Sequence, residues 1–163
     1  MKPGVAVDIP GFGRLELKVL VSDYTGTLSC GGKISAAVER RMARLAGRLE
    51  IHILTADTFG TVEREIGHLP VAVHRLEPLH QDAQKRTFVE GLGRKGVAAF
   101  GNGCNDRLLL RSVREGGGLA VAVDNGEGCA VETLQNANLF ISGAANALDL
   151  LLETDRLKAT LRF

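Results

Sequence analysis

Short apolar runs alternate with segments of helical spacing along most of the chain. After two strands expected within residues 5–23, the apolar runs lie at residues 50–57, 70–76, 97–103, 119–124 and 138–143. Helical spacing is found at residues 35–49, 61–69, 82–96, 105–118, 128–137 and 145–163. This alternation favours a parallel sheet covered on both faces, which right-handed crossovers make doubly wound. We therefore predict one α/β domain over residues 1–163.

The N-terminal part of the chain predicts a β-hairpin. Residues 5–23 contain two apolar runs joined by a turn with Pro10 and Gly11. The second run leads into the first core strand, which ends at Asp23. Ser35 stands where a helix N-cap is expected, directly before the helical segment.

Charge and composition argue against nucleic acid and membrane as partners. The chain has 20 Lys and Arg and 19 Asp and Glu, so its net charge is +1. No apolar stretch is long enough to cross a bilayer, and the first residues lack the apolar region of a signal peptide. Cys30, Cys104 and Cys129 are widely spaced and odd in number, which indicates neither a disulfide framework nor a zinc site. We expect a cytoplasmic protein.

Polar and small residues follow three of the predicted strands. They are residues 23–27 (DYTGT), 55–57 (TAD) and 101–106 (GNGCND). In open α/β sheets the ligand crevice lies outside the carboxyl ends of the strands, so these segments converge if the strands are neighbours. Exposed amides in glycine-rich turns favour phosphate, and clustered acids favour a hard cation such as Mg²⁺. The sequence therefore indicates a site for phosphoryl transfer.

These segments also resemble the motifs of a known family. DYTGTL, TAD and GNGCND, with a lysine between the last two, are similar in order and spacing to the motifs of the haloacid dehalogenase (HAD) superfamily. The variant looks most like the phosphorylation domain of P-type ATPases (DKTGT, TGD, GDGxND) and like the small soluble P-type ATPase-like phosphatases. The resemblance spans residues 23–106 and implies a Rossmann-like core.

The resemblance implies roles for the residues of the first two motifs. Asp23 is expected to be the nucleophile that forms an aspartyl-phosphate. Thr25 stands where HAD phosphatases usually carry a second Asp as general acid and base, although its backbone carbonyl can still ligate Mg²⁺. Thr55 is expected to bond the transferring phosphoryl group. Asp57 matches the P-type pattern, and a helix-capping role explains it equally well. For Asp23, Thr25 and Thr55 the alternative is an ordinary turn or capping role.

The remaining site residues come from later segments. Lys85 is the expected site lysine, with Lys95 as the alternative; either would neutralise phosphate charge. Asn102 replaces the first Asp of GDGxND, so its amide oxygen would hold Mg²⁺ more weakly. Asp106 would support the metal directly or through water, or else cap the helix after it.

The intervals between the motifs leave no room for an inserted domain. From Asp23 to Thr55 the pattern allows one helix and one strand, where P-type ATPases place their nucleotide-binding domain. With no membrane span, this excludes an ATP-driven pump. From Thr55 to Lys85 there is again only a helix, a strand and a short loop, so we expect no cap domain. An open site of this kind suits a bulky substrate or a roof from a neighbouring subunit, and we expect a homo-oligomer.

Two functions remain open from the sequence. The first is a Mg²⁺-dependent phosphatase or phosphotransferase that acts through phospho-Asp23, slowly because Thr25 supplies no carboxylate. The second is a non-catalytic or regulatory module that binds Mg²⁺ or a phosphorylated partner, which Thr25 and Asn102 motivate. The sequence does not name the phosphorylated substrate.

Overall fold

Six strands form one sheet in the order β5-β4-β3-β6-β7-β8 in the computed structural model, which describes residues 1–57 and 60–163. The strands are β3 Val19–Asp23, β4 Glu50–Thr55, β5 Ala72–Arg75, β6 Val97–Gly101, β7 Leu119–Asp124 and β8 Leu139–Ser142. Every pairing between them is parallel. The predicted parallel sheet is therefore confirmed.

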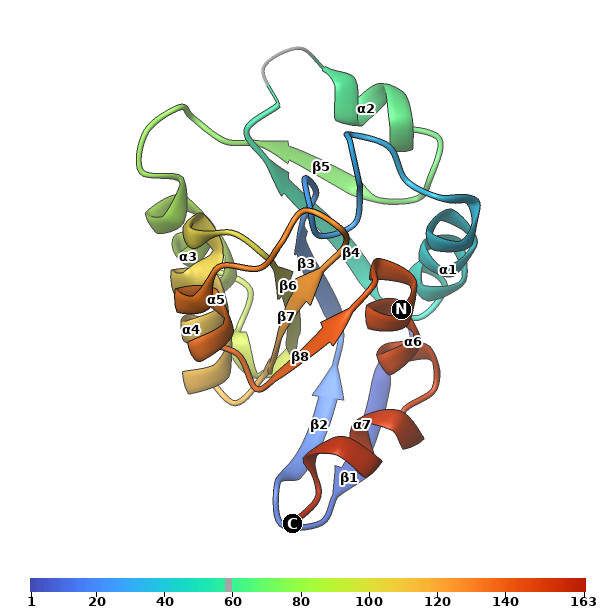
Figure 1. The fold of residues 1–163 in the computed structure, drawn as a ribbon. Helices are drawn as coiled ribbons and strands as arrows, with labels where there is room; N and C mark the ends of the chain where they lie inside the picture. The colour runs from blue at the N-terminus through green and yellow to red at the C-terminus, as the bar shows by residue number, and fades with distance from the viewer. Residues whose placement is uncertain (58–59) are drawn as a thin grey trace.

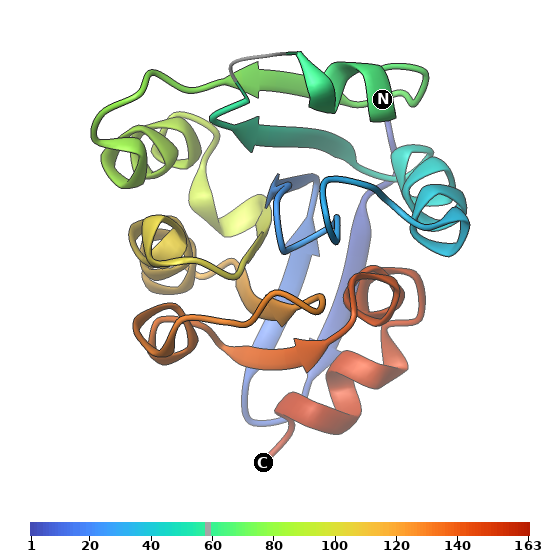
Figure 2. The same ribbon diagram turned by 45° about the horizontal axis from the view of Figure 1, so that its top comes forward.

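Helices cover both faces of this sheet, as Figures 1 and 2 show. One face carries α1 Ala36–Ala46, α2 Thr61–Ile66 and α6 Ala144–Leu152, and the other carries α3 Gln81–Glu90, α4 Arg107–Glu115 and α5 Val131–Gln135. Two 3₁₀ turns, η1 Arg94–Gly96 and η2 Cys104–Asp106, flank β6. Ser35 caps α1 as predicted, because its hydroxyl accepts a bond from the Val38 amide at 3.2 Å. The doubly wound arrangement is thus confirmed.

The central strands are buried on both sides, which explains their nearly continuous apolar sequence. Within β3, Leu20 belongs to the core beneath α1 and α6, whereas Val19 and Val21 belong to the core beneath α3 and α4. In β7 the residues on that second side are Ala120 and Ala122. These short side chains leave room for α4, which packs directly on β6 and β7.

The N-terminal hairpin forms as predicted, but its second strand is divided. Strands β1 Val5–Ile9 and β2 Gly13–Leu17 pair antiparallel in a sheet of their own, and β3 begins after Lys18. At Lys18 the backbone changes partners: its amide donates to the Gly96 carbonyl at 2.8 Å, and its carbonyl accepts from the Glu50 amide at 3.0 Å. The expectation of two strands in residues 5–23 was therefore wrong, because the structure has three: β1, β2 and β3.

The C-terminal segment is two helices instead of the single helix expected over 145–163. Helix α6 ends at Leu152, and α7 Asp155–Leu161 follows a break at Glu153, whose φ and ψ are −129° and 77°. The break turns α7 onto β1 and buries Leu157 completely. It also places Arg156 3.6 Å from the buried carboxylate of Asp149 in α6.

The order of the strands fixes where a ligand can bind. From β3 the chain moves outward through β4 to β5, and it then returns to β6 on the other side of β3 before continuing to β7 and β8. The connections that follow β3 and β6 therefore leave toward opposite faces of the sheet, and a crevice opens between the carboxyl ends of these two strands. In the part of the chain that the structure describes, no helix is long and apolar enough to cross a membrane.

The docking of α7 on the hairpin gives a stability prediction. Replacing the fully buried Leu157 by alanine leaves a cavity, and we expect the free energy of unfolding to fall by about 2–5 kcal/mol. Urea denaturation measures this change. Thr160→Ala, on the exposed side of the same helix, is the control and should change stability by less than about 0.5 kcal/mol. Equal effects of the two substitutions would contradict the packing of α7 described above.

Candidate active site

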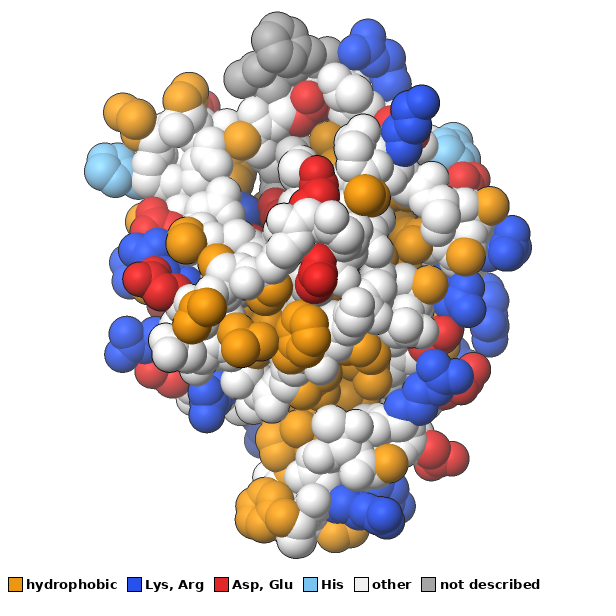
Figure 3. Space-filling model, in the orientation of Figure 1, with side chains coloured by type: hydrophobic (Ala, Val, Ile, Leu, Met, Phe, Trp, Pro, Cys, Tyr) orange, Lys and Arg blue, Asp and Glu red, His pale blue; other side chains and the backbone are white. Residues whose placement is uncertain are grey.

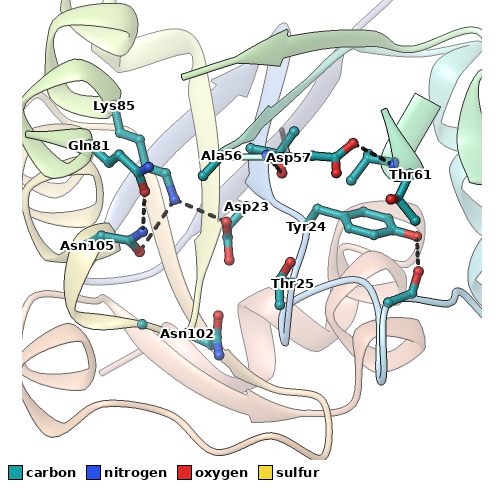
Figure 4. Close-up of a pocket in the computed structure, with 14 residues that line it drawn as sticks. Asp23, Tyr24, Thr25, Ala56, Asp57, Thr61, Gln81, Lys85, Asn102 and Asn105 are labelled. Atoms are coloured by element: carbon teal, nitrogen blue, oxygen red, sulfur yellow. Dashed lines mark hydrogen bonds and ion pairs between the residues drawn. The ribbon is translucent and has the colours of Figure 1, made fainter. Parts of the chain in front are cut away.

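A pocket of about 490 Å³ opens at the carboxyl ends of β3, β4 and β6. Figure 3 shows it as a hollow in the upper half of the molecule, and Figure 4 shows the side chains that line it. The lining residues are Asp23, Tyr24, Thr25, Gly32, Thr55, Ala56, Asp57, Thr61, Val62, Gln81, Lys85, Asn102, Gly103 and Asn105. All three motif segments of the sequence thus meet in one place.

The loop after β3 holds the Asp23 carboxylate at the floor of the pocket. The Tyr24 carbonyl accepts bonds from the amides of Thr27, Leu28 and Ser29, which folds the loop tightly. Gly26 has a φ of +75°, and a Cβ at this position would lie only 2.5 Å from Nδ2 of Asn102. A glycine is therefore required for the loop to touch the segment after β6.

Lys85 joins the two buried carboxylates of the site. Its ammonium reaches across from α3 and donates to Oδ1 of Asp23 at 3.0 Å and to Oδ1 of Asp106 at 2.7 Å. Figure 4 shows the Lys85 side chain directed at Asp23. The lysine is only 1% exposed. We refer to Asp23, Lys85 and Asp106 as the charged triad. The alternative, Lys95, lies in η1 before β6, at the opposite end of the strands.

Asp106 is fully buried and has partners on both carboxylate oxygens. While Oδ1 accepts from Lys85, Oδ2 accepts from the amides of Asn102 and Gly103 at 3.1 and 3.0 Å. Gly101 leaves room for this arrangement, because a Cβ there would lie 2.5 Å from the Cβ of Asp106. Asp106 thus fixes both the lysine and the loop after β6.

Thr27 connects the nucleophile candidate to Asn102, a link that the sequence analysis missed. Its hydroxyl lies 2.9 Å from Oδ1 of Asn102 and 3.3 Å from Oδ2 of Asp23. The Asn102 amide nitrogen donates to the Gly128 carbonyl at 3.2 Å, which fixes the direction of the amide. The only sequence signal for Thr27 was its place at the end of the DYTGT segment.

The residues beside Thr27 fit a hard cation. Two oxygens, from Asp23 and Asn102, face a hydroxyl that has one proton and can donate to only one of them at a time. Carboxylate, amide and carbonyl oxygens are the ligands that Mg²⁺ prefers. No group of three His, Cys, Asp or Glu residues that could hold a metal occurs in residues 1–57 and 60–163. A cation here would therefore rely on a mixed set of carboxylate and amide oxygens, such as those of Asp23 and Asn102.

The opposite wall of the pocket comes from the segment after β4. Thr55 is buried, and its hydroxyl accepts a bond from the Asp57 amide at 3.2 Å. Oδ2 of Asp57 accepts from the Val62 amide at 2.9 Å, so Asp57 caps the start of α2 while it also lines the pocket. The capping role that the sequence left open is thus present. Thr58 and Phe59 lie outside the described residues.

Burial and charge shift the pKa values of the charged triad. Burial, and then repulsion from Asp106, raise the pKa of Asp23 to about 7, although Lys85 opposes the shift. Burial alone would lower the pKa of Lys85, but Asp106 and Asp23 outweigh it and hold that pKa above its ordinary value. When all three groups are ionised, the triad carries one negative charge too many for its lysine to balance.

This imbalance predicts how stability depends on pH when no metal is present. The Asp23 carboxyl binds its proton more tightly in the folded chain, where its pKa is about 7, than at its ordinary 3.8. Its contribution to stability is therefore complete below about pH 4 and is lost as the pH rises through 7. At pH 8 with EDTA, Asp23→Asn should raise the free energy of unfolding by about 1–2 kcal/mol.

Urea denaturation at pH 4 and pH 8 checks this, with Asp82→Asn as the control. The Ala83 amide, and then Arg107, lower the pKa of Asp82, so its ionised form stabilises the fold. Neutralising Asp82 should therefore destabilise the chain at pH 8, opposite in sign to Asp23→Asn. A destabilised Asp23→Asn protein at pH 8 would contradict the charge balance described for the triad.

The chain is similar to known proteins in sequence and in fold. No model of a known protein family matches the chain. The uncharacterized protein MJ0073 of Methanocaldococcus jannaschii is 40% identical over 68 residues, which cover 42% of this chain and 69% of that protein. This similarity is high enough, over enough of the relative, to show common family membership.

Two solved structures share the fold at low sequence identity. A HAD superfamily (subfamily III A) hydrolase from Legionella pneumophila is 19% identical, with a TM-score of 0.67 over 89% of this chain and 87% of that one. The 3-deoxy-D-manno-octulosonate 8-phosphate phosphatase of Moraxella catarrhalis, solved with magnesium, phosphate and KDO, is 17% identical, with a TM-score of 0.63 over 90% and 94%. The chain therefore belongs to the same family as MJ0073, and its fold is that of the HAD superfamily hydrolases.

Proposed function

We propose that this chain is a Mg²⁺-dependent phosphatase or phosphotransferase that acts on phosphate monoesters through a phosphorylated Asp23. The observation that carries the proposal is the charged triad, in which one buried lysine bonds two buried carboxylates at the switch point of the sheet. The magnesium and phosphate bound in the M. catarrhalis phosphatase support it, because that protein shares the fold.

Asp23 is the nucleophile on this proposal. A carboxylate oxygen forms a bond to phosphorus as the bond from phosphorus to the leaving oxygen breaks, and the alcohol part departs with the electron pair. Lys85 holds the carboxylate in place and balances the charge that gathers around phosphorus. The buried Thr55 hydroxyl lies in the pocket wall and would bond the phosphoryl oxygens.

Asp23, the Thr25 carbonyl and the Asn102 side chain are the residues that would hold Mg²⁺. The ion supplies positive charge to the phosphoryl oxygens when it is bound. Asn102 contributes no charge, so the ion is held more weakly than with two or three carboxylates. Because both oxygens of Asp106 already have partners, we assign Asp106 to positioning Lys85 and the loop, with any contact to the ion made through water.

Thr25 determines how the second half of the reaction proceeds. It lines the pocket beside Asp23, but it has no carboxyl group to accept a proton from water or to protonate a leaving alcohol. General acid–base catalysis typically contributes ~10²–10⁴-fold. Phosphorylation of Asp23 should therefore be feasible for esters with good leaving groups, and hydrolysis of phospho-Asp23 should be slow.

A phosphatase assay with an aryl phosphate and Mg²⁺ tests the assignment of Asp23. We expect Asp23→Asn to reduce turnover to background, since the amide cannot attack phosphorus, and we expect EDTA to do the same to the wild type. Asp8→Asn changes an exposed acid in the hairpin and is the control, with unchanged turnover. Equal activity of wild type and Asp23→Asn would remove Asp23 from the mechanism.

Thr25→Asp tests the missing acid and base. Adding a carboxyl group at this position should raise steady-state turnover by about 10–100-fold, at the lower end of the range for general acid–base catalysis. Thr25→Asn is the matched control, because it has the same shape without a titratable group, and it should not accelerate turnover. A Thr25→Asp protein no faster than the wild type would contradict the proposed slow step.

Pre-steady-state kinetics separate the enzyme from the regulatory module. A burst of released alcohol followed by slow steady turnover fits phospho-Asp23 formation with slow hydrolysis. One equivalent of alcohol per chain with no later turnover favours a module that is phosphorylated once. Absence of both phases, with Mg²⁺ present, would favour a module that only binds.

A further inference from the structure

The edge of the sheet at β8 exposes apolar side chains. Phe140 in β8 is 48% exposed, and Val131 and Leu134 in α5 are 65% and 41% exposed. They are three of the six large apolar side chains that are exposed among the described residues, so exposed apolar surface is concentrated at this edge. Figure 3 shows hydrophobic side chains gathered over the region of α5 and β8. We refer to Phe140, Val131 and Leu134 as the edge patch.

Strand β8 has one side that is open for pairing. Among the described residues it pairs only with β7, in parallel register from Val121↔Leu139 to Asp124↔Ser142. An edge strand presents backbone amides and carbonyls that can pair with another chain, and natural folds commonly protect such an edge with charged side chains. The strand at the other edge of the sheet, β5, ends in an exposed cation of this kind, Arg75.

The edge at β8 lacks this protection. Residues 133–148 contain no Asp, Glu, Lys, Arg or His, although 24% of the whole chain is charged. Phe140 and Ser142 are nevertheless exposed. Glu132, just before this segment, lies 3.7 Å from the Arg107 guanidinium, so the two charges balance each other. An exposed edge strand without charges favours pairing with a further strand.

Hydrogen bonds hold the edge patch in a fixed position. The Ala130 amide donates to the Asn102 carbonyl at 2.7 Å, and the Thr133 hydroxyl donates to the Gly103 carbonyl. The helix α5 is thereby tied to the loop after β6. A partner that docks on the edge patch meets a preformed surface, so little conformational entropy is lost on association.

The two ends of β8 differ in charge, which suits a second copy of this chain. At the carboxyl end, Asp124 of β7 stands opposite Ser142. Before the amino end, the exposed Arg114 donates to the Gln135 carbonyl at 3.3 Å. Antiparallel pairing of two β8 strands brings the carboxyl end of one copy to the amino end of the other. The acidic end of each copy is then directed toward the basic end of its partner.

We propose that two copies of this chain form a dimer in which their β8 strands pair antiparallel and join the two six-stranded sheets into one. A twofold contact uses the same surface on both copies. The two edge patches therefore adjoin on one face of the joined sheet, with Phe140 close to its counterpart. The edge patch does not line the pocket, so the inference goes beyond the phosphatase function and does not depend on it.

Sedimentation velocity of the wild-type chain tests the dimer directly. We expect a species with twice the mass of one chain, whose share grows as the protein concentration rises from micromolar to hundreds of micromolar. A wild-type chain that stays monomeric over this whole range overturns the inference, and this is also the result expected if the edge patch serves a partner of another kind.

Charge substitutions at Phe140 test whether the edge patch meets its own copy. Phe140→Lys and Phe140→Glu each set like charges beside one another across the twofold axis, and each should weaken the dimer by about tenfold or more. Mixed in equal amounts, the two variants should associate with each other, because their opposite charges then pair. Leu79→Lys changes a leucine that is 74% exposed outside the edge patch, and this control should dimerise like the wild type.

Val131→Lys is the second variant, in case substitution of Phe140 prevents folding, and circular dichroism checks the fold of each protein. It places a charge at the most exposed residue of the edge patch and should also weaken the dimer. The inference is overturned if the folded variants of Phe140 and Val131 dimerise like the wild type. It is also overturned if Phe140→Lys and Phe140→Glu associate no better when mixed than either does alone, or if Leu79→Lys abolishes the dimer while Phe140→Lys does not.

Discussion

The structure around the site depends on one buried cation, the ammonium of Lys85. A lysine 1% exposed would lose several kcal/mol of hydration if it stood alone. Asp23 and Asp106 offset that cost, because the end of β3, the first turns of α3 and the turn η2 bring both carboxylates to within 3.0 Å of the lysine ammonium. Loss of either carboxylate alters the charge balance of the whole site, so the three elements are held in register by electrostatics as well as by packing.

The sheet places the triad through its strand order. Asp23 ends β3 and Gly101 ends β6. These neighbouring strands lie at the point from which the strand order runs outward to β5 on one side and to β8 on the other. Apolar residues on both faces of β3 and β6 fix these strands rigidly, so the polar groups at their ends inherit a fixed position. In each of these segments an apolar run forms the buried strand, and the polar and small residues that follow it form the loop that lines the site.

The sequence predicted the features that depend on residues close together in the chain. The strands, the Ser35 cap and the grouping of the three motif segments followed from periodicity and from the parallel sheet. The division at Lys18 and the break at Glu153 did not, because each is decided by a distant partner: Lys18 bonds Gly96 and Glu50, and the break docks α7 on β1. Thr27 was missed for the same reason, since its role depends on contact with a residue far along the chain.

Charge balance connects the chemistry of the site to its need for a cation. The ionised triad carries a net charge of −1, from two carboxylates and one ammonium. Asn102 is uncharged, so it adds nothing to this negative charge. A phosphate dianion approaching Asp23 would still be repelled, because Lys85 is already shared between two carboxylates. On the proposed function, Mg²⁺ beside Asp23 and Asn102 restores the attraction for phosphate.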